Sequence, residues 1–186
     1  MDRNEGMAWL RENVESESLI KHCLAVEAAM RGYAKIYGED EERWGLCGLL
    51  HDIDFEKHPD EHPFIGTEWL REKGFDEEFA LAVKGHGDYT NTPRESMLAK
   101  VLYAVDEMSS FVIAVALVRP DKFEGLASKS VKKKLKDKAF ARAVDREGVL
   151  RSAEELGVDF TEHIENVIGA LRTRETELAK EGLSLI

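Results

Sequence analysis

The sequence predicts an all-α fold, organised as a single-domain helical bundle. Only four prolines occur in 186 residues, and between them apolar residues recur at spacings of three and four, the period of an amphipathic helix. No stretch alternates apolar and polar residues as a half-buried strand does. Aspartates and glycines stand at the ends of the helical patterns, where helices are capped.

The first expected helix covers about residues 17–37 and stops at Gly38, because glycine readily adopts the left-handed conformation that ends helices. Its apolar stripe is Leu19, Cys23, Val26, Met30 and Tyr33. Asp40 is the expected N-cap of the second helix. That helix carries Trp44, Cys47 and Leu50.

A loop with two prolines separates these helices from a third, over residues 64–73, which ends at Gly74. Asp76 is expected to cap a fourth helix that ends near Gly85. Residues 92–95 read Thr-Pro-Arg-Glu, the pattern of a capping box with proline at the first helical position. They predict the start of the next helix.

That next helix is long and buried, with an apolar face that continues beyond Val105 and a possible break at Ser109 and Ser110. Pro120 ends it, because proline cannot continue a helix. Three further helices are expected near residues 131–144, 146–156 and 160–180. Asp145 and Asp159 cap the last two.

Length, composition and charge bound the class of protein. A chain of this length can bury a complete core as one domain, so residues 1–186 are expected to form a single domain. The net charge of −11 excludes a general binder of nucleic acid or anionic membranes, which would need a basic surface.

The expected setting is the cytoplasm. Two cysteines, Cys23 and Cys47, are too few for a disulfide framework and are expected to be small buried residues. The polar, acidic start lacks the order of a signal peptide. The longest apolar run, residues 111–118, is much shorter than a membrane span.

Three segments place histidine or aspartate on apolar helical faces. His22 shares a face with Leu19 and Val26, and Asp106 lies inside the long buried helix. His51 and Asp52 are adjacent at a helix end. A buried carboxylate needs a partner, and imidazole with carboxylate suits divalent Mn, Fe, Co, Ni or Zn better than Mg. Taken singly, a histidine on an apolar face is more often a hydrogen-bonded core residue than a metal ligand, and Asp106 could be a structural hydrogen-bond acceptor.

Three more histidines lie nearby in the sequence. His58 and His62 each precede a proline, which disfavours helical geometry, so their spacing does not place them on one face. His86 lies between two glycines just beyond a helix end. An exposed polar loop is the alternative for all three, and it is favoured for His58.

The order of these residues resembles the HD-domain superfamily of metal-dependent phosphohydrolases. The resemblance rests on His22, on the segment Leu-Leu-His-Asp-Ile-Asp at residues 49–54, and on Asp106. It implies a helical bundle of the HD-domain type, with a motif core at about residues 17–118 and a C-terminal helical extension at about 121–186. The sequence departs from the family at Asp54, where many members have glycine.

The resemblance also implies a site for one or two divalent ions. One ion would be held by His22, His51, Asp52 and Asp106. Asp52 would bridge to a second ion held by His62 and His86, and whether His58 replaces His62 stays open. Water activated between the ions would attack phosphorus, so no serine or cysteine nucleophile is required.

Other polar residues are candidates for supporting roles. Besides Asp52, the expected catalytic residues are Lys57, as a contact to a substrate phosphate, and Asp54, which would orient water or accept a loop hydrogen bond. Residues 129–146 carry eight basic and two acidic residues. The lysines of this segment are expected to form the solvent-facing side of an amphipathic helix, and a surface that gathers phosphate is the alternative. The candidate substrate-binding residues there are Lys132, Lys133 and Lys136.

The sequence thus favours a metal-dependent phosphohydrolase acting on a small phosphate ester such as a nucleotide. The same ligands are similar to those of HD proteins that use two irons to activate oxygen, so a diiron oxygenase is an alternative. A non-catalytic helical binding or regulatory module is a third. The expected partner is a small phosphate-bearing substrate, and the oligomeric state is open.

Overall fold

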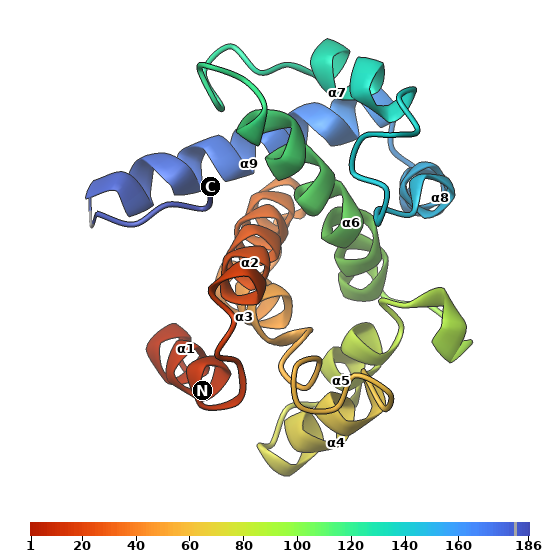
Figure 1. Cartoon of the computed structure of the whole chain (residues 1–186). Coiled ribbons are helices and arrows are strands. Elements are labelled where there is room, and N and C mark those ends of the chain that lie inside the picture. The colour runs from red at the N-terminus through yellow and green to blue at the C-terminus, as the bar shows by residue number, and fades with distance from the viewer. Residues whose placement is uncertain (181) are drawn as a thin grey trace.

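A computed structural model describes residues 1–180 and 182–186, and within these residues all regular structure is helical (Figure 1). The helices are α1 (Arg3–Asn13), α2 (Glu17–Tyr37), α3 (Glu41–Leu50), α4 (Phe64–Glu72), α5 (Glu77–Lys84), the short 3-10 helix η1 (Asp88–Thr90), α6 (Met97–Leu117), α7 (Ser128–Leu135), α8 (Arg146–Leu156) and α9 (Phe160–Lys180). None of the helices in this part of the chain combines the length and apolar character needed to cross a bilayer.

The two long helices α2 and α6 form the centre of the bundle. Each packs against the other and against α3 and α9, and α6 also packs against α5, α7 and α8. Figure 1 shows α9 across one end of this pair and α4 and α5 at the other end. The helices that carry the candidate ligands therefore belong to one packed framework.

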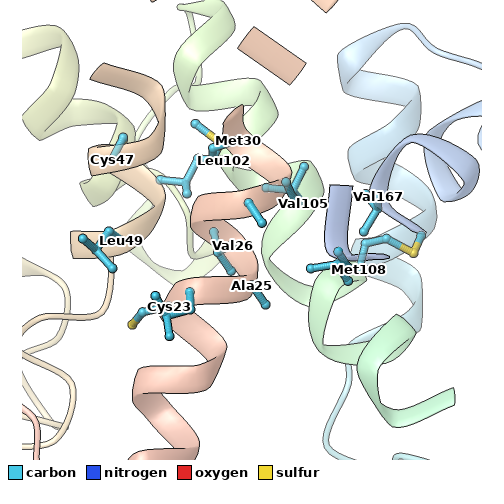
Figure 2. Close-up of a cluster of buried hydrophobic side chains, with 14 of the residues drawn as sticks. Cys23, Ala25, Val26, Met30, Cys47, Leu49, Leu102, Val105, Met108 and Val167 are labelled. Carbon is cyan, nitrogen blue, oxygen red and sulfur yellow. The ribbon is translucent and has the colours of Figure 1, made fainter. Parts of the chain in front are cut away.

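The core fills the space between α2, α3, α6 and α9 (Figure 2). The side chains labelled there include Cys23, Val26 and Met30 of α2, Leu49 of α3, Leu102 and Val105 of α6, and Val167 of α9. All of these are fully buried, and a large apolar side chain contributes about 1.5–3 kcal/mol when buried. Cys23 and Cys47 are buried and free, as expected.

Most of the predicted helix ends are confirmed. Gly38 ends α2 in the left-handed conformation, with φ of 71°. Asp40, Asp76 and Asp145 each accept a hydrogen bond from a backbone N–H in the first turn of the helix that follows. Asp159 does the same for Thr161 and Glu162 in α9.

Helix α1 was not expected from the sequence. Asp2 accepts a hydrogen bond from the Glu5 N–H at 2.9 Å, and the Glu5 carboxylate accepts one from the Asp2 N–H at 2.7 Å. This reciprocal pair is a capping box with aspartate in place of serine or threonine. The helix packs on α3 and buries Trp9 and Leu10.

The predicted start and break of α6 were wrong. Ser96, and not Thr92, caps the helix, because its hydroxyl accepts a hydrogen bond from the Ala99 N–H. The Arg94 guanidinium donates a hydrogen bond to the Gly85 carbonyl at 2.9 Å. This contact holds residues 92–95 in a loop. The helix continues through Ser109 without interruption, since the surrounding core buries that residue completely.

The basic helix α7 is shorter than the predicted span of residues 131–144. It ends at Leu135, and turns follow. The Arg146 guanidinium donates hydrogen bonds to the carbonyl oxygens of Leu135 and Ala141, both at 3.3 Å. These contacts hold the chain in turns because they use carbonyls that a continuing helix would have paired internally.

Candidate metal centre

Six side chains from separate segments converge at one place in the bundle. His22 comes from α2, His51 from the C-terminal end of α3, Asp52 from the next position, His62 from the loop before α4, His86 from the end of α5, and Asp106 from the middle of α6. They are the six ligands that the sequence predicted. The packing of α2, α3, α5 and α6 brings them together.

The carboxylate of Asp52 lies between the histidines. Its Oδ1 is 3.4 Å from the His51 Nε2, 3.3 Å from the His62 Nε2 and 3.5 Å from the His86 Nε2. Its Oδ2 is 3.5 Å from the His22 Nε2. The two oxygens thus face different histidines, as expected of a carboxylate that is shared between two ions.

The remaining distances place the other ligands in two halves, and His51 lies with Asp52 between them. In one half, the His22 Nε2 lies 3.1 Å from both the His51 Nε2 and the Asp106 Oδ1. In the other half, the Nε2 atoms of His62 and His86 are 3.1 Å apart. We call these the His22 half and the His62 half.

The contact made by the Nδ1 atom of each ring orients the ring so that its Nε2 atom faces the centre. Nδ1 lies 2.8 Å from the Gly48 O in His51, 2.5 Å from the Val83 O in His86, 2.7 Å from the Asp54 Oδ1 in His62 and 2.9 Å from the Ser110 Oγ in His22. Carbonyl and carboxylate oxygens only accept hydrogen bonds, so at least three rings carry their proton on Nδ1. Their Nε2 lone pairs therefore face the centre, the arrangement of metal-ligating histidines.

The electrostatics of the centre favour positive charge. Burial lowers the pKa of His22, but hydrogen bonds to Asp106 and Asp52 outweigh it and raise that pKa to about 10. Asp52 similarly overcomes burial and raises the pKa of His86 to about 9. Burial raises the pKa of Asp106, but the neighbouring His22 and His51 bring it well below its usual range. Divalent cations would supply the charge that these groups attract.

The donor set fits a transition metal. The centre presents imidazole nitrogens and carboxylate oxygens. Two groups have ligand atoms close enough together to hold one ion, and they share His51: His22, His51 and Asp106, and His51, Asp52 and His86. Imidazole suits Mn, Fe, Co, Ni and Zn, whereas Mg prefers an all-oxygen shell. The residues present therefore fit one or two divalent ions of the first group.

A cavity of about 570 Å³ opens onto the centre, a size that suits a small molecule. Besides five of the six ligands, its lining includes Phe55, Gly87, Asp88, Tyr89, Tyr103, Glu107, Ser110, Asp145 and Gly148. None of the described residues that line it is a lysine or an arginine. An anionic ligand would therefore depend on bound cations for charge neutralisation.

Two of the predicted catalytic residues lie away from this cavity. Asp54 is fully buried behind His62 and accepts a hydrogen bond from the His62 Nδ1. It cannot orient water in the cavity from there. The Lys57 ammonium donates instead to the Glu12 carbonyl at 2.8 Å and to the Asn13 Oδ1 at 3.0 Å, because the loop that carries it packs against the end of α1.

The predicted substrate-binding lysines also lie outside the cavity lining. Lys132 hydrogen-bonds the Thr161 hydroxyl of α9, and Lys133 and Lys136 are exposed. Val131 on the same helix is fully buried. This is the solvent-facing side of an amphipathic helix, the interpretation that the sequence favoured for these lysines.

Three further residues at the cavity, Ser110, Glu107 and Tyr89, were not predicted from the sequence. Ser110 follows Asp106 by four positions, so one turn of α6 aims both at the centre. Glu107 lines the cavity, and burial together with the Asp106 charge raises its pKa to about 7. The Tyr89 hydroxyl donates to the His62 carbonyl at 3.2 Å. Helical spacing from Asp106 was a usable signal for Ser110, whereas tertiary packing alone places Tyr89.

His58 does not reach the centre. Its ring packs edge-on against Trp69, with centroids 5.4 Å apart, and its Nδ1 lies 3.9 Å from the Glu61 Oε1. Of the two histidines that precede prolines, His62 is the one that faces Asp52.

The fold and the site together define a helical protein built around a histidine–aspartate centre suited to divalent metals. The HD domain family matches residues 19–116, just over half of the chain, and the chain belongs to this family. HD domains bind divalent metals, and the family consists generally of metal-dependent hydrolases.

The chain is also similar to a protein of Methanocaldococcus jannaschii named "Uncharacterized protein MJ0778". The two are 44% identical over 81 residues, which are 40% of this chain and 48% of that protein. The chain thus matches about half the length of this relative.

Proposed function

We propose that this protein is a metal-dependent phosphohydrolase that hydrolyses a small phosphate ester, such as a nucleotide, with metal-activated water. The observation that carries the proposal is the position of Asp52, whose carboxylate lies within 3.5 Å of the Nε2 atoms of His22 and His51 in one half and of His62 and His86 in the other. A shared carboxylate is how two-metal hydrolytic sites hold their ions a few ångströms apart. Membership of the HD domain family supports the same chemistry.

The residues would divide the ions between them. His22, His51, Asp52 and Asp106 would hold one ion, and Asp52 with His62 and His86 the second. Divalent ions at such a centre supply activation of water near neutral pH and neutralisation of charge on the transferring phosphoryl group.

The rest of the cavity wall would select and orient the substrate. Phe55 and Tyr89 are exposed at the cavity and offer apolar ring surface. Glu107 lies beside Asp106 and lines the same cavity, so its carboxyl group could contact a bound substrate. The cavity lacks basic side chains among its described lining, which favours a small substrate whose phosphate is bound by the metal centre.

The test is release of inorganic phosphate from nucleoside monophosphates and a generic aryl phosphate, with manganese or cobalt added. We expect metal-dependent turnover in the wild type and a loss of at least 10³-fold in kcat/KM in Asp52→Ala, on the order of what loss of electrostatic stabilisation costs. Asp60→Ala, an exposed change in the same loop, is the matched control. Protein of verified metal content that is inert towards the whole panel would contradict the proposal.

The count of histidines also supports a second candidate, a diiron oxygenase. The four imidazoles and two carboxylates of the centre, with Asp52 as the shared carboxylate, suit iron as well as manganese. Elemental analysis and oxygen uptake with a polyol or a phosphonate separate the two functions. Two tightly held irons with oxygen consumption would favour the oxygenase, and iron-free protein after growth with added iron would argue against it.

A further inference from the structure

Asp54 is a buried carboxylate that no step of the proposed hydrolysis uses. It is fully buried, and both of its oxygens are engaged. Oδ1 accepts a hydrogen bond from the His62 Nδ1 at 2.7 Å, and Oδ2 accepts one from the Gly66 N–H at 2.6 Å. Burying an ionisable group costs free energy unless such partners compensate it. The Asp54–His62 contact therefore indicates a role for this carboxylate.

The partner of His62 differs in kind from those of the other rings. The Nδ1 atoms of His51 and His86 face neutral backbone carbonyls, and that of His22 faces the hydroxyl of Ser110. Only His62, among the described ligands, is backed by a carboxylate. A carboxylate that accepts a hydrogen bond from a ligating histidine fixes the tautomer and orientation of the ring and makes the other ring nitrogen a stronger metal ligand.

The start of α4 is shaped to hold this carboxylate. Gly66 lies in the first turn of α4, where free N–H groups and the helix dipole favour a negative charge. A Cβ at Gly66 would lie 2.9 Å from both the Cγ and the Oδ1 of Asp54, closer than packed atoms allow. Glycine at this position therefore lets the helix approach Asp54 closely enough to donate its N–H.

We propose that Asp54 is a positioning residue that makes the His62 half of the centre a separate metal position, whose occupancy depends on the Asp54–His62 contact. The His22 half has its own ring partners and does not share this dependence. The proposal rests on the metal centre of the proposed function and not on the reaction catalysed there. The ligand at this position would be a divalent transition-metal ion, bound by His62, His86 and Asp52.

The test measures metal content rather than turnover. The purified chain of residues 1–186 is loaded with manganese and dialysed against graded chelator. The number of ions per chain and the magnetic coupling of the manganese ions are then measured. We expect two coupled ions in the wild type and one uncoupled ion in Asp54→Asn, with affinity at the second position lowered about 10- to 100-fold. Asp60→Asn makes the same chemical change at an exposed position of the same loop and should behave as the wild type.

Two further variants show whether Asp54 acts through His62. His62→Asn should lose the same ion, and adding Asp54→Asn to it should change the metal content no further, since residues that act as a unit are not additive. Gly66→Ala displaces the carboxylate without removing its charge and should also lose the ion selectively. It keeps the proposal testable if Asp54→Asn fails to fold, as judged by circular dichroism.

The inference is overturned if Asp54→Asn and Gly66→Ala keep both ions at wild-type affinity, if they lose both ions together, or if the wild type holds a single ion. A wild type with two ions and no phosphatase activity would refute the proposed hydrolysis, but it would leave the metal comparison between variants decisive. The two failures are therefore distinguishable.

Discussion

Lys57 follows the His51-Asp52 pair closely in sequence, yet its ammonium group donates to the Glu12 carbonyl and the Asn13 side chain. Glu12 is in the last turn of α1, where a cation interacts favourably with the free carbonyls. We expect Lys57→Ala to leave kcat and KM for phosphate release within about twofold and to lower the free energy of unfolding by less than about 1 kcal/mol, because the contact is exposed.

Steady-state kinetics and urea unfolding of the same preparation check this prediction. A loss of tenfold or more in kcat with unchanged stability would contradict it and would return Lys57 to the catalytic residues. A charge-preserving Lys57→Arg variant distinguishes loss of the contact with α1 from loss of the positive charge.

Helical spacing explains which single residues the sequence could identify. His22 and Asp106 lie within long helices, so their faces follow from the apolar residues one turn away. His62 and Asp54 belong to a loop whose path depends on contacts with α1 and α4, and local spacing carries no information about that path. The sequence therefore predicted His62 as a ligand through a family resemblance. It left open whether Asp54 orients water or accepts a loop hydrogen bond, and in the structure Asp54 accepts a hydrogen bond from His62.

At the scale of helices, side-chain caps were the reliable signals. Asp40, Asp76 and Asp145 were predicted as N-caps and accept the expected backbone hydrogen bonds. The capping box at Asp2 follows the same physical rule, although the helix that it begins was not predicted. Thr92 was predicted as an N-cap but does not cap a helix. The hydrogen bond from the nearby Arg94 to Gly85 keeps this segment in a loop.

His163 joins three helices and makes their packing sensitive to pH. Its Nε2 lies 2.9 Å from the Ala104 carbonyl of α6, so the ring donates there, and its Nδ1 accepts from the Tyr33 hydroxyl of α2 at 2.5 Å. Burial lowers the pKa of His163 to about 4. The folded protein therefore holds this ring neutral, whereas the unfolded chain takes up a proton below its ordinary pKa of 6.5.

The sign follows from proton binding. Between about pH 4 and 6.5 the unfolded state binds more protons at this site, so stability rises with pH through that window and is lost as pH falls. The full shift corresponds to roughly 3 kcal/mol. We expect urea unfolding of the wild type to show a steeper pH dependence across this window than His163→Gln, measured under identical metal conditions. Equal slopes in the two proteins would contradict a neutral buried His163.

For the molecule as a whole, the net charge of −11 overstates the acidity of the working site. It counts Asp52 and Asp106 as free charges, although bound cations would neutralise them. The ligands also come from α2, α3, α5, α6 and the loop before α4, segments far apart in the chain. A bound ion would therefore act as a cross-link among elements that the hydrophobic core already holds together.

Removal of metal should consequently destabilise the whole bundle without unfolding it. Apolar residues from α1 to the C-terminal segment form the core, so metal-free protein keeps a packed interior and should remain helical by circular dichroism. Free metal at 100 times its dissociation constant stabilises a protein by about 2.7 kcal/mol, which for a chain of this size raises the melting temperature by roughly 5–10 °C. Thermal unfolding of chelator-treated protein, repeated with manganese restored, measures this difference. Asp52→Ala, which lacks the shared carboxylate, should show a much smaller response to manganese. If chelated and manganese-loaded wild type melt at the same temperature, the six residues do not form a metal centre of useful affinity.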